Sequence, residues 1–224
     1  EISEFSLFSI TQEIKEIHPS IDIESIIADI KDVEKCDAIM KKFSPDIIYH
    51  AAAYKHVPIL EDENNIKVSI ENNFLGTVEL AKLAIKHQVP KFVFVSTDKA
   101  VRPSNIMGAS KRMAEIYMQI LSASSDSTMI SSVRFGNVID SSGSVIPIFR
   151  KQIKSGGPVT VTHPEMVRYF MTIGEAAYLV IMASIIAKKT GVFLLKMGDP
   201  VKIFDLAKRM IALSGNEYKS IGNK

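Results

Sequence analysis

The stretch Phe92-Val93-Phe94-Val95-Ser96-Thr97-Asp98-Lys99 decides the fold of this chain. Its first four residues form an apolar run of the kind that makes a buried parallel strand. Open α/β sheets bind their ligands at the carboxyl ends of such strands. The three residues after Ser96 bring a hydroxyl, an acid and a base to that position. The alternative is that Ser-Thr-Asp caps the next helix and Lys99 is solvated.

Apolar runs alternate with helix-period segments on both sides of this stretch. The runs predict strands at 23–27, 47–50, 92–96, 130–135 and 192–195, and the periodic segments predict helices at 33–43, 73–87 and 105–122. Such alternation is typical of an α/β fold with a doubly wound parallel sheet. In the helix at 105–122, Lys111 lies one turn after Met107, so both residues face the same way. Later, 159–162 is predicted to form a short strand, and 176–187 a core helix too short to span a bilayer.

Composition excludes several classes of protein. The 224 residues are enough for one substantial core with a small appended lobe. A formal net charge of +2 is too small to indicate binding to nucleic acid or a membrane surface. The single Cys36 excludes an internal disulfide framework and fits a reducing compartment. His50 and His56 are not spaced as metal ligands, so no metal site is expected. The acidic start, Glu1-Ile2-Ser3-Glu4, does not resemble a signal peptide.

Five motifs resemble one family. The segment 96–112, STDKAVRPSNIMGASKR, resembles the extended short-chain dehydrogenase/reductases that act as nucleotide-sugar 4,6-dehydratases in bacterial polysaccharide synthesis. The resemblance covers nearly the whole chain through YHAAAYKHVP (49–58), NFLGT (73–77), RFGNV (134–138) and PVTVTHPE with RYFMT (158–165 and 168–172). Where the superfamily carries Tyr-x-x-x-Lys, this chain has Met107-x-x-x-Lys111. That pattern resembles the UDP-N-acetylglucosamine 4,6-dehydratases of capsule and O-antigen type.

The resemblance implies a Rossmann-like fold with a small, discontinuous substrate lobe. It assigns 1–146 to an NAD-binding domain and 147–224 mostly to the substrate lobe, with 172–188 packing back on the main sheet. No Gly-x-Gly-x-x-Gly occurs in the sequence. Because Glu1 aligns near the end of the second strand, the resemblance places the first strand and its glycine turn upstream. It also places a terminal segment of the family beyond the end of this chain.

The resemblance also implies the reaction and the catalytic residues. NAD would take hydride from C4 of the sugar and later return it to C6, after water has left across C5 and C6. Asp98 would be the acid at the C6 hydroxyl, Lys99 the base at C5, and Thr97 a hydrogen-bond partner of the C4 hydroxyl. Lys111 would hold the nicotinamide ribose. Since the thioether of Met107 cannot take a proton, another group or a water takes the C4 proton, or the site is impaired.

Further positions are carried over from the family as binding residues. Asp29 and Ile30 would contact the adenine, although Asp29 could instead cap a helix together with Asp32. The small residues Ala51, Ala52 and Ala53 would lie next to the cofactor, and Glu1 would be the acid that binds its ribose. Lys55 would contact the substrate. Asn73 would hold the backbone of the fold in place.

The nucleotide half of the substrate is assigned to later residues. Asn137 and Arg168 would hold it, because a guanidinium engages two diphosphate oxygens at once. Arg168 could instead pair with Glu165. The resemblance implies an apolar wall from Val145, Ile146 and Pro147, and places Thr160 near the uracil. Asp140 stands where relatives carry a small residue.

The leading interpretation is therefore an NAD-dependent UDP-N-acetylglucosamine 4,6-dehydratase, a hydro-lyase that makes a 4-keto-6-deoxy sugar nucleotide. One alternative is a dehydratase that also inverts C5. Another is a non-catalytic nucleotide-sugar-binding fragment, because the chain lacks the glycine turn and could be inactive alone. The expected partners are a UDP-sugar and further copies of the chain, with no nucleic acid. The expected location is the cytoplasm, or the cytoplasmic domain of an inner-membrane protein if the parent carries an upstream transmembrane region.

Overall fold

The computed structural model describes residues 1–141, 143–187 and 189–220. Its backbone divides into two compact units, each discontinuous in sequence. The first unit consists of 1–132 with 187–192, and the second begins at Val133, runs to Ile186 and resumes at Phe193. The assignment of 1–146 to NAD binding and 147–224 to substrate binding remains a prediction about function.

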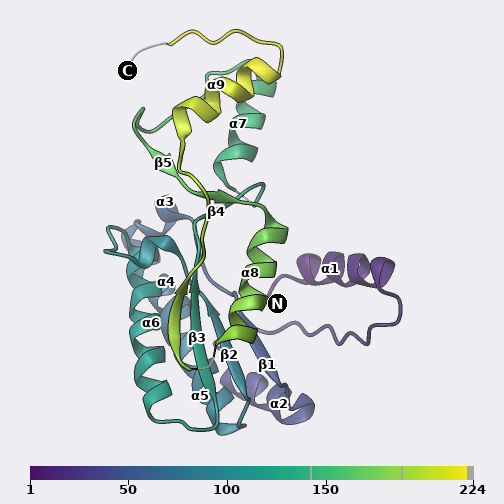
Figure 1. The fold of residues 1–224 in the computed structure, drawn as a ribbon. Coiled ribbons are helices and arrows are strands. Elements are labelled where there is room, and N and C mark those ends of the chain that lie inside the picture. Colours follow the sequence, from purple (N-terminus) through teal and green to yellow (C-terminus); the bar gives the residue numbers. More distant parts are fainter. Residues whose placement is uncertain (142, 188, 221–224) are drawn as a thin grey trace. The chain divides into compact units, whose positions relative to one another are not determined.

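A four-stranded sheet has the strand order β1-β2-β3-β7 (Figure 1). Its strands are β1 (Ile47–His50), β2 (Lys91–Val95), β3 (Met129–Arg134) and β7 (Gly191–Leu194). Strands β1 and β2 pair in parallel, with Ile47 opposite Lys91 and His50 opposite Phe94. All four strands were expected from the sequence, and each boundary agrees within one residue.

Helices of the first unit form its main core with the sheet. They are α2 (Val33–Phe43), α3 (Val57–Leu60), α4 (Glu63–Ile70), the π-helix η1 (Glu71–Gly76), α5 (Thr77–Lys86), the 3₁₀ turn η2 (Asp98–Ala100) and α6 (Ile106–Ala123). Apolar residues of α2, α5 and α6 pack with Phe92, Phe94 and Ile130 of the sheet. The helix predicted at 73–87 begins earlier, at Glu63, where the Asp62 side chain accepts a hydrogen bond from Asn64 N at 2.9 Å.

The strand predicted at 23–27 is wrong, because this segment forms neither strand nor helix. A strand needs a partner for its backbone groups. Here Glu1 O accepts from Ala28 N and Glu1 N donates to Ile26 O, and these two bonds do not make a ladder. The preceding residues form α1 (Glu4–Ile17), which the sequence analysis did not anticipate. No residue of α1 is buried, and in Figure 1 it stands apart from the sheet.

The second unit contains two small sheets and three helices among its described residues. Strand β4 (Asn137–Val138) pairs in parallel with β6 (Phe170–Met171), and β5 (Val167–Arg168) pairs antiparallel with β8 (Val201–Lys202). Its helices are α7 (Val145–Lys154), α8 (Ile173–Ile186) and α9 (Ile203–Leu213). Phe149 of α7 packs with Ile203 and Ala207 of α9 to form its core.

The short strand predicted at 159–162 is also wrong. Val159 and Val161 do pack against this core, but the segment has no ladder of hydrogen bonds. Thr160 N donates instead to the side-chain oxygen of Gln152 at 3.2 Å. The alternation of apolar and polar residues therefore reflects burial of one side of a loop.

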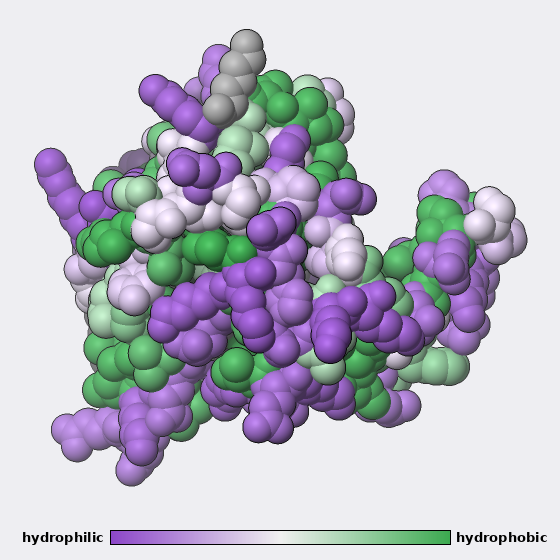
Figure 2. All heavy atoms as spheres, turned by 90° about the horizontal axis from the view of Figure 1, so that it is seen from below, coloured by the Kyte–Doolittle hydropathy of each residue, from purple (hydrophilic) through white to green (hydrophobic). Residues whose placement is uncertain are grey.

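The surface mixes apolar and charged residues. Figure 2 shows green apolar side chains among purple hydrophilic ones on the face that it views. A span across a bilayer would need a long, apolar helix, and no helix in the described part of the chain meets both conditions.

Candidate active site

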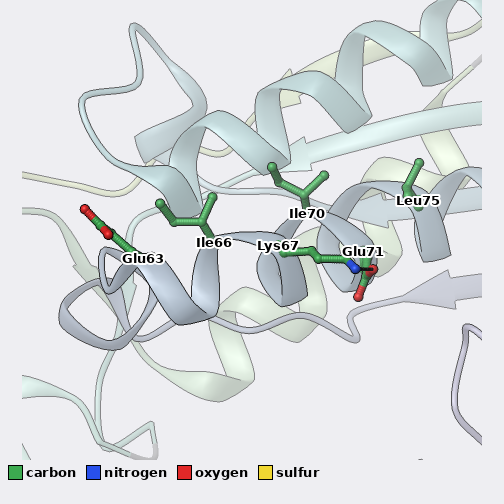
Figure 3. Close-up of a pocket in the computed structure, with 6 residues that line it drawn as sticks. All are labelled: Glu63, Ile66, Lys67, Ile70, Glu71 and Leu75. Atoms are coloured by element: carbon green, nitrogen blue, oxygen red, sulfur yellow. Dashed lines mark ion pairs between the residues drawn. The ribbon is translucent and has the colours of Figure 1, made fainter.

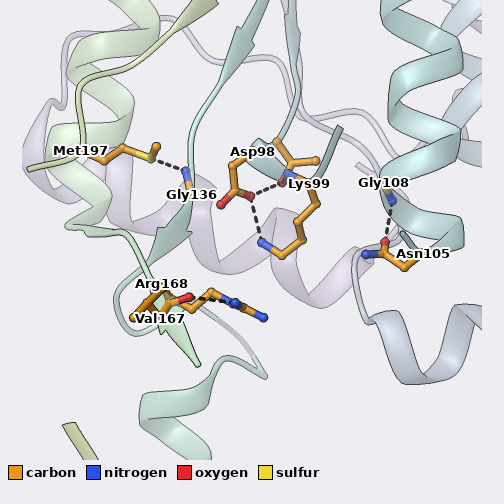
Figure 4. Close-up of polar contacts among 9 residues, drawn as sticks. Asp98, Lys99, Asn105, Gly108, Gly136, Val167, Arg168 and Met197 are labelled. Carbon is orange, nitrogen blue, oxygen red and sulfur yellow. Dashed lines mark hydrogen bonds and ion pairs between the residues drawn. The ribbon is translucent and has the colours of Figure 1, made fainter. Parts of the chain in front are cut away.

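Thr97, Asp98 and Lys99 lie together directly after strand β2, in the 3₁₀ turn η2 and at its cap. The Thr97 hydroxyl donates to Asp98 Oδ1 at 3.0 Å, and Lys99 Nζ lies 3.0 Å from the same oxygen (Figure 4). Thr97 Oγ1 also accepts from Lys99 N at 3.3 Å, so it caps the turn as well. The side chains of Asp98 and Lys99 are 25% and 27% exposed, which leaves the pair accessible to a bound molecule.

Helix α6 begins against this turn. The Asn105 side chain accepts from Gly108 N at 2.8 Å and caps the helix (Figure 4). A Cβ atom on Gly108 would lie 2.3 Å from Lys99 O, much closer than real Cβ atoms come. Glycine at 108 thus lets the first turn of α6 touch the backbone of the Asp98–Lys99 pair. Met107, beside it, is buried.

Lys111 is buried beneath the end of strand β2. Its Nζ donates to Val95 O at 2.9 Å and lies 4.5 Å from the centroid of the Phe94 ring. Burial lowers the pKa of Lys111 to about 7, and the neighbouring charge of Glu115 opposes that shift. A lysine in this position can gain or lose its proton near neutral pH.

Sequence reasoning missed two buried polar residues next to the site. Glu115, on α6, is 0% exposed and accepts from Ser96 Oγ at 2.6 Å. His50, at the end of β1, lies 2.8 Å from Thr77 Oγ1. Because the Thr77 hydroxyl donates its hydrogen to Asn73 O, His50 Nε2 is the donor. Burial lowers the pKa of His50 to about 3. The spacing of Glu115 from Lys111, four residues along a helix, was the available signal.

Asn73 fixes backbone, as expected. It lies in the π-helix η1 and is fully buried. Its side chain accepts from Tyr54 N at 2.8 Å and donates to Tyr54 O at 2.9 Å and to Ser110 Oγ at 3.2 Å. The amide thus joins the loop after β1 to helix α6, and π-helical turns are common at functional sites.

The candidate cofactor residues lie on loops of the first unit. Asp32, not Asp29, caps α2, so the capping alternative for Asp29 is wrong. Asp29 Oδ1 accepts from Lys31 N at 2.9 Å. Ile30 packs against the main core, close to Gly76. Ala51, Ala52, Ala53 and Lys55 follow strand β1 in a segment without regular structure. Their contacts with a cofactor or substrate remain predictions.

The second unit brings four predicted substrate residues into one cavity of about 190 Å³. These are Asn137, Val145, Thr160 and Arg168, and the rest of the lining comes from Phe149, Val161, Thr162, Met166 and Ile203. Ile146 and Pro147 belong to the same helix as Val145 but are not among the lining residues. The cavity combines an apolar wall with an amide, a hydroxyl and a guanidinium.

Ion pairs near this cavity clarify two open points. Glu165 pairs with Lys202 at 2.9 Å, while Arg168 Nη1 donates to Val167 O at 2.8 Å (Figure 4). Glu165 therefore pairs with a lysine, Lys202, and Arg168 bonds to the backbone. Asp140 adopts a left-handed backbone with φ of 57° and pairs with Arg150 at 3.2 Å. Aspartate tolerates that conformation better than most residues.

A larger hollow of about 520 Å³ lies along α4 and η1 (Figure 3). It is lined by Glu63, Ile66, Lys67, Ile70, Glu71 and Leu75, and none of the predicted site residues is among them. Two of its three charged residues, Lys67 and Glu71, form an ion pair at 3.7 Å. The predicted catalytic residues follow β2 instead, and the predicted nucleotide-binding residues line the smaller cavity. Among the described residues, no group of three or more His, Cys, Asp and Glu is placed to hold a metal ion.

Comparisons with known proteins identify relatives of this chain. A family model described as "Polysaccharide biosynthesis protein" matches residues 1–224. The chain is 51% identical over 220 residues to the capsular polysaccharide biosynthesis protein CapD of Staphylococcus aureus, covering 98% of this chain and 36% of CapD. The chain thus spans about a third of the length of that curated relative.

Solved structures show the same fold. The structure of Pen from Bacillus thuringiensis is 36% identical, with a TM-score of 0.88, and the match covers 99% of this chain and 69% of Pen. A dTDP-glucose 4,6-dehydratase, DesIV from Streptomyces venezuelae with NAD bound, has a TM-score of 0.79 at 18% identity, covering 92% of this chain and 68% of DesIV. UDP-glucose 4-epimerases are also among the similar proteins.

The expected α/β Rossmann-like fold is therefore confirmed. The motif Thr97-Asp98-Lys99 follows the carboxyl end of strand β2, which is where open α/β sheets bind their ligands. The chain belongs to the family of polysaccharide biosynthesis proteins.

Proposed function

We propose that this protein is an NAD-dependent 4,6-dehydratase that converts UDP-N-acetylglucosamine to a 4-keto-6-deoxy sugar nucleotide for polysaccharide synthesis. The observation that carries the proposal is the contact of Asp98 Oδ1 with both the Thr97 hydroxyl and Lys99 Nζ, each at 3.0 Å. Removal of water across C5 and C6 needs an acid and a base close together. A 4-epimerisation breaks no C6–O bond and has no use for such a pair.

The proposed elimination moves one proton through each member of the pair. To start the elimination, Asp98 must carry a proton and Lys99 must be neutral. Asp98 then gives its proton to the C6 hydroxyl, which leaves as water, and Lys99 takes the proton from C5. The products of this step are a carboxylate and an ammonium on neighbouring side chains. Lys99 returns its proton to C5 when hydride reaches C6.

Thr97 supplies a route for the proton that Met107 cannot accept. A Thr97 hydroxyl bonded to the C4 hydroxyl takes that proton as it passes its own to Asp98 Oδ1, 3.0 Å away. Oxidation at C4 thus protonates the carboxyl that the next step needs as an acid. The proton lost from the C4 hydroxyl leaves in the water from C6, so the protons balance without a tyrosine at 107.

The residues around the site fit a nicotinamide dinucleotide. Ala51, Ala52 and Ala53 carry only methyl side chains after β1, so a flat ring can approach their backbone. The Asp29 carboxylate is partly exposed and can accept from an adenosine group. Lys111 would hold the nicotinamide ribose. When bound, NAD supplies the acceptor for hydride from C4 and the donor of hydride to C6.

The cavity of the second unit is assigned to the nucleotide half of the substrate. The Arg168 guanidinium suits a diphosphate because its planar donors can bind two oxygens. Thr160 and Asn137 offer hydrogen bonds to the uracil, and Val145 an apolar surface.

The test is to incubate the purified full-length protein with NAD and UDP-N-acetylglucosamine and to follow the sugar by NMR. The expected product has a ketone at C4 and a methyl group at C6, and its C5 coupling constants distinguish retention from inversion. Formation of UDP-N-acetylgalactosamine would replace this proposal with a 4-epimerase. If substrate and NAD bind but the sugar does not change, the proposal is replaced by the alternative of a non-catalytic nucleotide-sugar-binding protein.

A further inference from the structure

Glu115 is a buried carboxylate that the proposed reaction does not use. It is 0% exposed, and its oxygens accept from Ser96 Oγ at 2.6 Å and from Arg112 Nη1 at 3.2 Å. Burying a carboxylate is costly unless it is paired and hydrogen-bonded. Of these two partners, Arg112 is 40% exposed, whereas Ser96 is buried next to the catalytic turn. The geometry thus directs the carboxylate toward Ser96.

Ser96 lies between two residues that matter to the site. The carbonyl of Val95, before it, accepts from Lys111 Nζ at 2.9 Å, and Thr97 follows it. Lys111 and Glu115 are four residues apart and therefore share one face of α6. Helix α6 therefore binds two successive residues at the end of β2. Lys111 donates to the Val95 carbonyl, and Glu115 accepts from the Ser96 hydroxyl.

We infer that Glu115 is a positioning residue, which fixes Ser96 so that the Thr97-Asp98-Lys99 turn stays aligned with Lys111 on helix α6. The inference rests on the proposed function, because it assigns that turn and Lys111 to one reaction. Glu115 does not touch the substrate; it acts through Ser96 and through its charge.

The charge of Glu115 acts on Lys111. Burial lowers the pKa of Lys111, and Glu115 raises it. The groups that face the ammonium from β2 are the Val95 carbonyl and the Phe94 ring, neither of which titrates. From β1 comes His50, which stays neutral near neutral pH because its own pKa is about 3. Among these groups Glu115 is the anion next to Lys111, and its charge raises the pKa of Lys111.

Two substitutions separate these effects. Glu115→Gln can still accept from Ser96 but removes the charge, so the alkaline limb of the activity profile should move down by about one pH unit. Ser96→Ala keeps the charge but removes the hydrogen bond, so kcat should fall about 10- to 100-fold at every pH. KM for UDP-N-acetylglucosamine should stay within about threefold in both, because neither residue binds the substrate. Lys82→Gln, which removes an exposed lysine of α5 paired with Glu79, is the control and should change neither quantity.

A direct titration makes the result independent of turnover. In protein labelled with ¹³C at lysine Cε, the Lys111 resonance is assigned by its loss in Lys111→Met. Its titration should move to lower pH in Glu115→Gln and stay unchanged in Ser96→Ala and Lys82→Gln.

An unchanged Lys111 titration in Glu115→Gln, or a Ser96→Ala protein with wild-type kcat, would overturn the inference. If Glu115→Gln does not fold, Ser96→Ala still decides. If the wild type does not act on UDP-N-acetylglucosamine, the proposed function fails by itself, and the titration still decides whether Glu115 acts on Lys111.

Discussion

Replacing Gly108 with alanine tests the contact that joins helix α6 to the catalytic turn. The new Cβ would lie 2.3 Å from Lys99 O and 3.0 Å from Lys99 C. Real Cβ atoms essentially never come within 3.0 Å of another atom, so helix and turn must separate by about 0.7 Å. The obstructing atoms are backbone and cannot rotate away. Alanine at 108 therefore displaces Lys99 from Lys111.

The expected loss of stability follows from two opposing effects. Overpacking of this kind costs about 1–3 kcal/mol, whereas alanine in place of glycine inside a helix contributes about 1 kcal/mol in its favour. A net loss of about 1 kcal/mol would lower the Tm of a chain of this size by roughly 2–4 °C. Because misplacement by 1 Å can cost about 100-fold in rate, a shift of this size should lower kcat by at least about 10-fold.

The assay combines thermal unfolding followed by circular dichroism with kcat for the dehydration. Gly174→Ala is the matched control, because a Cβ at 174 in α8 meets nothing within 4 Å. It should leave Tm equal or slightly higher. A Gly108→Ala protein that melts at or above the wild-type temperature and keeps kcat within about twofold would refute the reasoning, since it would mean that the contact with Lys99 O is absent.

Three further predictions concern single side chains. Asp98→Asn should still allow hydride transfer from C4 but stall before water leaves. Mixing this variant with UDP-N-acetylglucosamine should therefore give a burst of absorbance near 340 nm from bound NADH. Normal turnover would exclude Asp98 as the acid. Met107→Leu changes volume and polarity little and should keep most of kcat, whereas a loss of about a thousandfold would show that the sulfur takes part in the chemistry. The pKa of His50 is about 3 in the folded protein against an ordinary 6.5, so the unfolded chain binds more protons between these values and stability falls as pH falls. Between pH 7 and 4.5 the wild type should lose about 2–3 kcal/mol more than His50→Gln in urea unfolding; equal losses would contradict a buried neutral imidazole.

Sequence patterns predicted the elements whose signals are local. The helix at 33–43 and the strand at 47–50 were located to the residue, because each has its full periodicity within its own length. The segment 23–27 has the composition of a strand, but a strand also needs a paired neighbour. Patterns within a window of residues carry no information about that neighbour.

The candidate site also contains some features that have a local signal in the sequence and others that have none. The order of Thr97, Asp98 and Lys99 after an apolar run predicted their position, and the resemblance gathered Asn137, Val145, Thr160 and Arg168, which line one cavity. The contact of Ser96 with Glu115 joins residues 19 apart and has no local signal. Nor does composition predict that Gly108 touches Lys99 O, because that proximity is a property of two packed backbones.

The π-helix η1 has a consequence for how this region can change in length. Because a π turn closes its hydrogen bonds i→i+5, η1 holds about one residue more than an α-helical turn would. Deleting one residue from Glu71–Gly76 can therefore turn this stretch into α-helix and keep Thr77, Val78 and Ala81 on the buried face of α5. A deletion within α5 itself has no extra residue to absorb it and would rotate the side chains after it by roughly 100°.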